Sequence, residues 1–251
     1  MDSYTGFAAV YDRFMEETPY DEWCEVICGI LSENKIDDGL VCELGAGTGE
    51  MTRRLRDKGY DMIGIDNSEE MLMVARDKEK ESDDILYLCQ DMREFELYGT
   101  VRAVVSVCDS VNYVLNKPEL CETFRLVNNY LDPKGIFIFD FNTRYKYKNV
   151  IGEATIAESN EDASFIWENY YDDESKINQY DITFFVKEGE LYRRFTETHL
   201  QRGYTLSEMK KLIEQSGLEF VKAFDADSLS EPDRKSERIV IVARERGKEN
   251  E

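Results

Sequence analysis

Histidine and proline are scarce in this chain of 251 residues, which holds one histidine and four prolines. A structural zinc site needs several cysteine and histidine ligands at paired spacings, and no such pairs occur here. The sequence therefore predicts no metal site. The cysteines lie mostly inside apolar runs, as reduced thiols do in a reducing compartment. They are Cys24, Cys28, Cys42, Cys89, Cys108 and Cys121.

Long hydrophobic runs are also missing. The longest uncharged apolar runs are as long as a strand, far short of the ~20 residues of a membrane span. The first residues lack a basic segment followed by an apolar stretch, which a secretory signal would show. We therefore expect a cytoplasmic protein with no membrane partner.

Basic side chains are outnumbered by acidic ones, 31 against 53, which leaves a formal net charge of −22. The acids are spread along the whole chain. A field of this sign opposes the approach of phosphate backbones and anionic lipids. Nucleic acid is therefore disfavoured as a partner. A local basic cleft can persist in an acidic protein, and solubility is the simplest reason for the excess of acidic residues.

Short apolar runs alternate with helical patterns from about residue 20 to residue 140, which predicts parallel strands joined by helices. Helical stripes or start signals occur at 23–31, at Asn67 with Glu70 as a capping pair, and at Lys117 followed by proline. We expect strand, helix and strand to repeat four times. Because the apolar runs are nearly continuous, they are expected to be buried on both faces. The runs are 40–44, 62–65, 85–89, 103–108 and 136–139.

Beyond Asp140 the pattern changes to alternating segments at 164–171, 177–187 and 191–200. Such alternation without helices predicts an antiparallel β-meander inserted into the α/β domain. The α/β pattern resumes with a capping box at 205–208, a helix closed by Gly217 and strands at 218–224 and 238–243. The predicted organisation is an N-terminal helical segment or lid (1–35), a domain of two pieces (36–142 and 205–244) and the inserted lid (143–204).

A glycine-rich loop, Glu-Leu-Gly-Ala-Gly-Thr-Gly at 43–49, ends the first predicted strand and opens a helix. Asp66 ends the second strand, 21 residues after Gly45, and Asp91 and Asp109 follow the third and fourth. The carboxyl ends of parallel strands are the edge where open α/β sheets bind ligands. Position 50 is glutamate where a dinucleotide fingerprint needs glycine or alanine, and no P-loop follows. A tight turn without a ligand is the alternative reading.

Four motifs resemble those of class I S-adenosylmethionine-dependent methyltransferases. They are the loop at 43–49, Ile-Gly-Ile-Asp at 63–66, Gln-Asp-Met at 90–92 and Leu-Asp-Pro-Lys-Gly at 131–135. The resemblance covers roughly residues 36–142. It implies a Rossmann-like, seven-stranded sheet with S-adenosylmethionine as cofactor. The chain looks most like a subgroup of small bacterial members with a meander after the fifth strand, whose substrates are generally unassigned.

The resemblance also implies a cofactor site. Gly45, Ala46 and Gly47 would pack against the methionine part, with Glu43 orienting its amino group. Asp66 would accept from the ribose hydroxyls, with Asn67 beside it, and Met71 would line the adenine pocket. Asp91 would accept from the adenine amino group and the Met92 backbone would contact the ring. Cys108 and Asp109 would lie near the sulfonium and the entering substrate. Tyr11, on the N-terminal segment, would cover the cofactor.

The segment at 108–113 has no proline, unlike the tetrad with which nucleic-acid amino-methyltransferases grip a flipped base. We therefore expect methyl transfer to nitrogen or oxygen of a small molecule. His199 is the candidate proton acceptor, since its ordinary pKa lies near neutrality, and a structural hydrogen-bonding role is its alternative. From 153 to 200 the chain carries 12 acids against four bases. If this insertion covers the substrate, the acceptor is neutral or cationic rather than phosphorylated.

Two other functions stay open at this point. One is a non-catalytic module that binds the cofactor as a sensor or assembly partner. The other is a methyltransferase that acts on a protein or a tRNA. The sequence leaves the oligomeric state open between monomer and homodimer.

Overall fold

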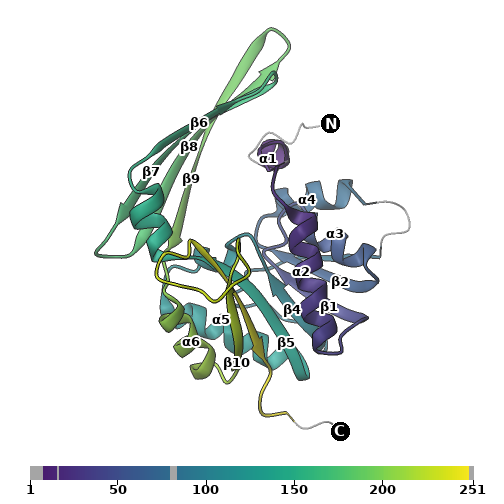
Figure 1. The fold of residues 1–251 in the computed structure, drawn as a ribbon. Helices are drawn as coiled ribbons and strands as arrows, with labels where there is room; N and C mark the ends of the chain where they lie inside the picture. Colours follow the sequence, from purple (N-terminus) through teal and green to yellow (C-terminus); the bar gives the residue numbers. More distant parts are fainter. Residues whose placement is uncertain (1–7, 16, 80–83, 249–251) are drawn as a thin grey trace.

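Two β-sheets build the molecule, as Figure 1 shows. The computed structural model describes residues 8–15, 17–79 and 84–248. The large sheet has seven strands in the order β10-β11-β5-β4-β1-β2-β3, and the small sheet has the order β6-β7-β8-β9. The large sheet comprises β1 (Gly39–Leu44), β2 (Tyr60–Asp66), β3 (Leu86–Cys89), β4 (Val101–Ser106), β5 (Leu131–Asn142), β10 (Glu219–Asp225) and β11 (Arg238–Arg244). The predicted fold class is confirmed.

The first five strands are parallel, as their apolar composition predicted. Strand β11 pairs antiparallel with both β5 and β10. Central strands are buried from both sides: Val41 and Cys42 on β1, and Val104 and Val105 on β4, are inaccessible to solvent. Five parallel strands therefore point their carboxyl ends toward one edge of the sheet, where the motif residues gather.

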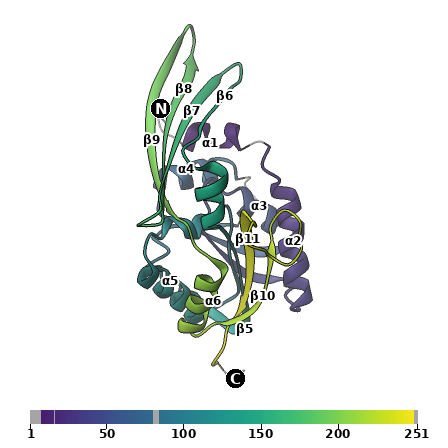
Figure 2. The ribbon, with the colours of Figure 1, turned by 60° about the vertical axis from the view of Figure 1, so that its left-hand side comes forward.

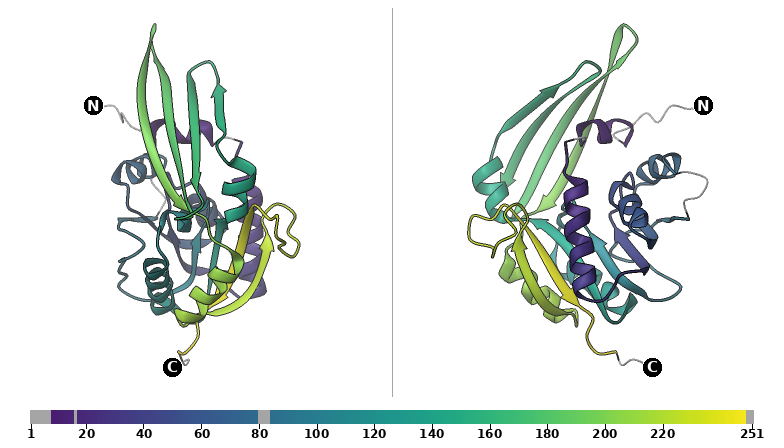
Figure 3. Two further views of the ribbon diagram at one scale, coloured as in Figure 1. Left: turned by 90° about the vertical axis from the view of Figure 1, so that its left-hand side faces the viewer. Right: turned by 45° about the vertical axis from the view of Figure 1, so that its right-hand side comes forward.

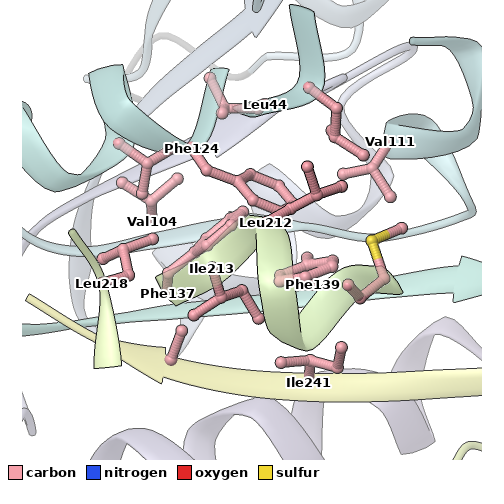
Figure 4. Packing of buried hydrophobic residues seen from close by; sticks show 14 of the residues in the cluster. Leu44, Val104, Val111, Phe124, Phe137, Phe139, Leu212, Ile213, Leu218 and Ile241 are labelled. Carbon is pink, nitrogen blue, oxygen red and sulfur yellow. The ribbon is translucent and has the colours of Figure 1, made fainter. Parts of the chain in front are cut away.

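Helices cover both faces of the large sheet (Figure 3). On one face, α5 (Lys117–Tyr130) and α6 (Leu206–Gln215) enclose a cluster that includes Phe124, Phe137 and Phe139, seen in Figure 4. The other face is covered by α2 (Tyr20–Glu33) and α3 (Glu50–Asp57), whose apolar side chains meet those of β1, β4 and β5. Each parallel strand thus contributes alternate side chains to two cores.

Helix starts were predicted with one error. The capping box at Thr205 and Glu208 is present, and Asn116 caps α5 by accepting from the Glu119 amide at 2.9 Å. For α4 (Glu69–Asp77) the predicted cap, Asn67, is wrong. Ser68 caps this helix, and its hydroxyl accepts from the Met71 amide at 3.2 Å. A second correction concerns residues 90–100, which join β3 to β4 without a helix.

The inserted sheet is antiparallel, with four strands where the sequence predicted three. Its strands are β6 (Thr155–Ser159), β7 (Ala163–Asp172), β8 (Ile177–Glu188) and β9 (Leu191–Arg202). Every residue of β6 is exposed. Its sequence therefore lacks the alternation of buried apolar and exposed polar side chains by which a strand is predicted. A π-helical turn, Lys146–Ile151, leads from β5 into this sheet.

The inserted sheet rises from the edge of the large sheet where β5 ends, with the short helix α1 (Ala8–Phe14) beside it (Figure 2). In the part of the chain that the structure describes, no helix combines the length and apolarity that a membrane span requires.

Asn112 joins the insert to the large sheet. It lies in the 3₁₀ turn after β4, Ser110–Tyr113, and is fully buried. Its amide nitrogen donates to the carbonyls of Asn142 at 2.9 Å and Arg202 at 2.7 Å, and its oxygen accepts from the Asn142 amide at 2.9 Å. The turn, β5 and the end of β9 are therefore held by one side chain.

We expect Asn112→Ala to lower the free energy of unfolding by about 2–4 kcal/mol, because three buried backbone groups lose their partner. Chemical denaturation measures the change. The control is Asn129→Ala on the exposed side of α5, where the change should stay within about 0.5 kcal/mol. Equal stability of the two variants would contradict the anchoring role.

Candidate active site

A cavity of about 1230 Å³ lies between the carboxyl edge of the large sheet, α1 and the inserted sheet. All thirteen site residues predicted from the sequence line it. They are Tyr11, Glu43, Gly45, Ala46, Gly47, Asp66, Asn67, Met71, Asp91, Met92, Cys108, Asp109 and His199. The structure thus brings together residues from α1, four parallel strand ends and β9.

The glycine-rich loop forms one wall with bare backbone. Gly45 and Gly47 have φ angles of 76° and 53°, in the left-handed region that glycine adopts readily. The Gly45 and Ala46 amides donate to the Ile65 carbonyl at 2.8 and 2.9 Å, which ties the loop to β2. A Cβ atom on Gly47 would meet no atom within 4 Å, so it would project into the cavity itself.

Asp66 is held at the end of β2 by backbone donors. Its carboxylate accepts from the Gly47 amide and from the Ser68 amide, both at 2.8 Å. Burial raises the pKa of Asp66, and the backbone hydrogen bonds oppose that rise. A carboxylate fixed in this way is oriented before any ligand arrives.

Glu43 carries a second acidic group at the floor of the cavity. It is almost fully buried, and the Thr52 hydroxyl donates to its carboxylate. Burial raises the pKa of Glu43 to about 8. Among the described residues, no basic side chain forms an ion pair with it. A cationic group bound beside Glu43 would therefore meet a carboxyl that lacks a counter-ion.

Asp91 differs from the other strand-end acids because it already has a cationic partner. The Arg93 guanidinium donates to its two oxygens at 2.9 and 2.5 Å, and this bond holds the pKa of Asp91 below its ordinary value. Met92 lines the cavity beside it, and Asn67 and Met71 line the neighbouring stretch after β2.

The turn after β4 is strained. Cys108 and Asp109 have φ angles of 56° and 51°, a conformation that costs a side-chain-bearing residue roughly 1–3 kcal/mol. Asp140, at the end of β5, compensates: its carboxylate accepts from the Cys108 amide at 3.2 Å and the Asp109 amide at 2.6 Å. Arg238 lies 3.6 Å from Asp140. The sequence analysis did not single out Asp140, since only the fold brings it to this turn.

Two further residues connect Asp109 to the insert. The Gln201 amide donates to the Asp109 carboxylate at 2.5 Å, and the Tyr147 hydroxyl donates to the Gln201 oxygen at 2.5 Å. Gln201 and Tyr147 are buried. Sequence reasoning missed both as site residues, because Gln201 comes from β9 and Tyr147 from the π-helical turn that leads into the inserted sheet.

His199 belongs to an aromatic wall. Its Nδ1 lies 3.2 Å from the Tyr113 hydroxyl, and its ring stacks on Tyr180 with centroids 5.5 Å apart. Tyr180 in turn packs against Trp167 at 5.1 Å. Burial lowers the pKa of His199, so the ring is neutral at pH 7. The sequence did not predict this aromatic wall, although it did predict the meander from the alternation of residue types along the segments that form β7, β8 and β9.

The N-terminal helix α1 contacts both halves of the cavity. Tyr11 lines it, and Asp12 accepts from the Thr48 hydroxyl at 2.5 Å and pairs with Lys78. Phe14 packs edge-on against Phe165 of the insert, with centroids 4.9 Å apart. This helix therefore links the glycine-rich loop to the inserted sheet.

Comparisons with known proteins show the family to which this chain belongs. A family model described as a methyltransferase domain matches residues 41–135. YqeM of Bacillus subtilis (strain 168), whose name places it among the methyltransferases, is 39% identical over 96% of each chain. The crystal structure of an S-adenosylmethionine-dependent methyltransferase from Clostridium acetobutylicum ATCC 824 matches with a TM-score of 0.88 and 29% identity, over 96% of this chain and 98% of that one.

A more distant relative has a defined reaction. The dTDP-3-amino-3,4,6-trideoxy-alpha-D-glucopyranose N,N-dimethyltransferase of Streptomyces venezuelae is 28% identical over 53% of this chain and 56% of its own. The chain belongs to the class I S-adenosylmethionine-dependent methyltransferases, and S-adenosylmethionine is its cofactor.

The site residues fit this cofactor. S-adenosylmethionine carries a sulfonium and an ammonium group, and the cavity offers Glu43 without a counter-ion and open space at Gly47. Asp66 presents an oriented acceptor at the position where nucleotide folds bind ribose hydroxyls. Both the charge and the shape of the cavity therefore suit a cationic nucleoside.

We expect Asp66→Ala to weaken binding of S-adenosylmethionine by about 1–3 kcal/mol, because a charge-assisted hydrogen bond to the ribose is lost. Isothermal titration measures this affinity. Asp61→Ala is the matched control, since Asp61 lies on the same strand but is exposed. Unchanged affinity in the Asp66 variant would refute its assignment to the cofactor.

A second pair of variants tests the open space at Gly47. Gly47 and Gly59 both have positive φ, and a Cβ on either meets nothing within 4 Å, but Gly59 lies in an exposed turn outside the cavity. Both alanine variants should lose roughly 1 kcal/mol of stability. Only Gly47→Ala should also weaken cofactor affinity, by about tenfold or more, because its methyl group occupies the site. Equal cofactor affinity in both variants would argue against this placement.

Proposed function

We propose that this methyltransferase transfers the methyl group to nitrogen or oxygen of a small neutral or cationic molecule. In this proposal residues 36–142 and 205–244 bind the cofactor. The insert (143–204) covers the acceptor as a lid that determines specificity. The N-terminal segment (1–35), which the structure describes from residue 8 onward except for residue 16, covers the cofactor. The site residues named above, other than His199, take the roles that the family resemblance implies.

The charge of the cavity lining carries the proposal. Nine acidic side chains line it against three basic ones, Arg93, Lys146 and Arg238. Arg93 is paired with Asp91, and Arg238 faces Asp140. Since the arginines are engaged and acids predominate, a phosphorylated acceptor would be repelled. The aromatic wall of the insert suits an apolar or cationic molecule instead.

The relative from Streptomyces venezuelae supports a small acceptor as well. Its name states that it methylates an amino group of a sugar nucleotide. Small-molecule nitrogen is therefore an acceptor known among proteins of similar sequence. The acceptor of that relative carries a diphosphate, and in this respect it differs from the neutral or cationic molecule proposed here.

S-adenosylmethionine supplies a methyl group on a positively charged sulfur, which makes that group electrophilic. The protein has to align the acceptor with this group and keep water out. Asp66 and the glycine-rich loop orient the cofactor, and the turn at Cys108 and Asp109 faces the acceptor. His199 is the proton acceptor predicted from the sequence, and its neutral ring at the cavity wall is compatible with that role.

The test is transfer of tritiated methyl groups by the purified full chain to a bacterial small-molecule extract, with bulk tRNA and a protein extract in parallel. We expect label in the small molecules, and none when Asp66→Ala protein is assayed at a low cofactor concentration. Label in tRNA or protein would replace the small-molecule proposal. Cofactor binding with no transfer to any of the three would indicate a non-catalytic module.

A further inference from the structure

Asp109 occupies an unusual position in the acceptor part of the cavity. Because the Tyr147 hydroxyl donates to the Gln201 oxygen, the Gln201 amide nitrogen must point toward Asp109. This chain of two hydrogen bonds holds one carboxylate oxygen, Oδ2. Among the described residues, no donor to the other oxygen is recorded. The carboxylate is thus oriented from one side and has capacity left to accept on the other.

The charged groups near Asp109 include two cations, but neither forms an ion pair with its carboxylate. These charged groups are Asp140, Lys146 and Arg238. Asp140 accepts from the backbone of the same turn and faces Arg238. The Lys146 ammonium donates to the Asn142 side chain at 2.9 Å rather than to Asp109. Burial, and then the nearby Asp140 carboxylate, raise the pKa of Asp109 to about 6.

The remaining titratable groups around Asp109 are neutral near pH 7. They are the thiol of Cys108 and the phenols of Tyr11, Tyr113, Tyr147 and Tyr180, whose pKa values are all raised by burial. None of them supplies a positive charge. The free oxygen of Asp109 is therefore open to direct contact with a cationic group of a ligand.

Aromatic faces lie next to this carboxylate. The Tyr113 hydroxyl interacts with the side chains of Tyr180 and Gln201 and lies 3.2 Å from His199. All of these residues line the cavity together with Asp109. Since His199 is uncharged, its ring and the two phenols present neutral aromatic surface. A protonated amine is attracted both by aromatic faces and by a carboxylate.

We propose that the methyl acceptor is an amine, that it binds as its ammonium ion between Asp109 and the wall of Tyr113, Tyr180 and His199, and that Asp109 takes its proton. This inference rests on the proposed function and narrows the acceptor atom to nitrogen. Asp109 would be a catalytic residue, whereas Gln201 and Tyr147 are positioning residues. Asp109 thereby takes the role that the sequence analysis gave to His199.

An N–H bond of the ammonium ion breaks and its proton passes to the Asp109 carboxylate, which leaves the electron pair on nitrogen. That pair forms the new N–C bond, while the C–S bond of the sulfonium breaks and its electron pair goes to sulfur. The methylated nitrogen carries the positive charge, and Asp109 releases its proton to solvent after the product leaves.

The experiment divides a bacterial small-molecule extract at pH 7 into cationic, neutral and anionic fractions by ion exchange. Each fraction is incubated with the full chain and tritiated S-adenosylmethionine. We expect label only with the cationic fraction, in a product that cation exchangers retain and mild base leaves intact. Label with the neutral or anionic fraction alone overturns the inference but leaves the proposed function standing. No label with any fraction contradicts both.

Variants then test Asp109 itself. Asp109→Asn keeps the shape of the side chain, and it should lower transfer to the cationic fraction by about 100-fold or more, the range of a lost general base. Affinity for S-adenosylhomocysteine should stay within about threefold, which also reports that the variant is folded. Asp181→Asn is the matched control and should retain full activity. Asp181 lies on β8 but is exposed and outside the cavity.

The pH profile separates Asp109 from His199. In the unaltered protein, kcat/KM should fall as the pH drops through about 6, because protonated Asp109 cannot accept a proton. Tyr147→Phe should move this fall to higher pH, since Gln201 is no longer oriented to stabilise the carboxylate. His199→Asn should keep the fall where it is. A profile that is unchanged in Asp109→Asn, or a fall that is abolished in His199→Asn, overturns the assignment.

Discussion

The Asp140 carboxylate holds the turn that carries Asp109, and this part of the cavity depends on that contact. Two consecutive residues with side chains, Cys108 and Asp109, adopt left-handed backbone angles, and their amides donate to Asp140. Without the Asp140 carboxylate as hydrogen-bond acceptor, the strained turn would relax and the Asp109 side chain would turn away from the cavity. Asp140 is buried at the end of β5, so the central parallel strands themselves hold the strained turn in place.

From this turn, the connections spread to the insert. Asp109 accepts from Gln201, and Asn112 bonds to the backbone of Arg202, so the base of β9 is joined to the large sheet by two polar contacts. On the opposite side, α1 connects the glycine-rich loop to the insert through Asp12 and Phe14. The glycine-rich loop and the aromatic wall thus belong to one connected structure. This connection matters because methyl transfer needs the methyl donor and the methyl acceptor in line.

Much of this arrangement was predictable, because its signals are local. Continuous apolar runs revealed the parallel strands, and the glycines and acids at 43–49, Asp66 and Asp91 marked the ligand edge. The errors have equally local causes. Asn67 and Ser68 are both good capping residues, and only backbone geometry selects Ser68. Strand β6 was not predicted, because none of its side chains is buried.

The sequence by itself determined the fold class, the cofactor and which residues stand at the carboxyl edge of the sheet. The fold class and the ligand edge follow from the period of the apolar pattern and from residues at the strand ends, and the cofactor follows from the resemblance of short motifs to those of a known family. Only the tertiary structure decided which side chains surround Asp109. Tyr113, Tyr147 and Gln201 come from three elements far apart in the chain. No spacing in the sequence predicts that their hydroxyl and amide groups meet, because only folding brings them together. Burial then sets the charge of Asp109 and His199, and burial is a property of the folded chain alone.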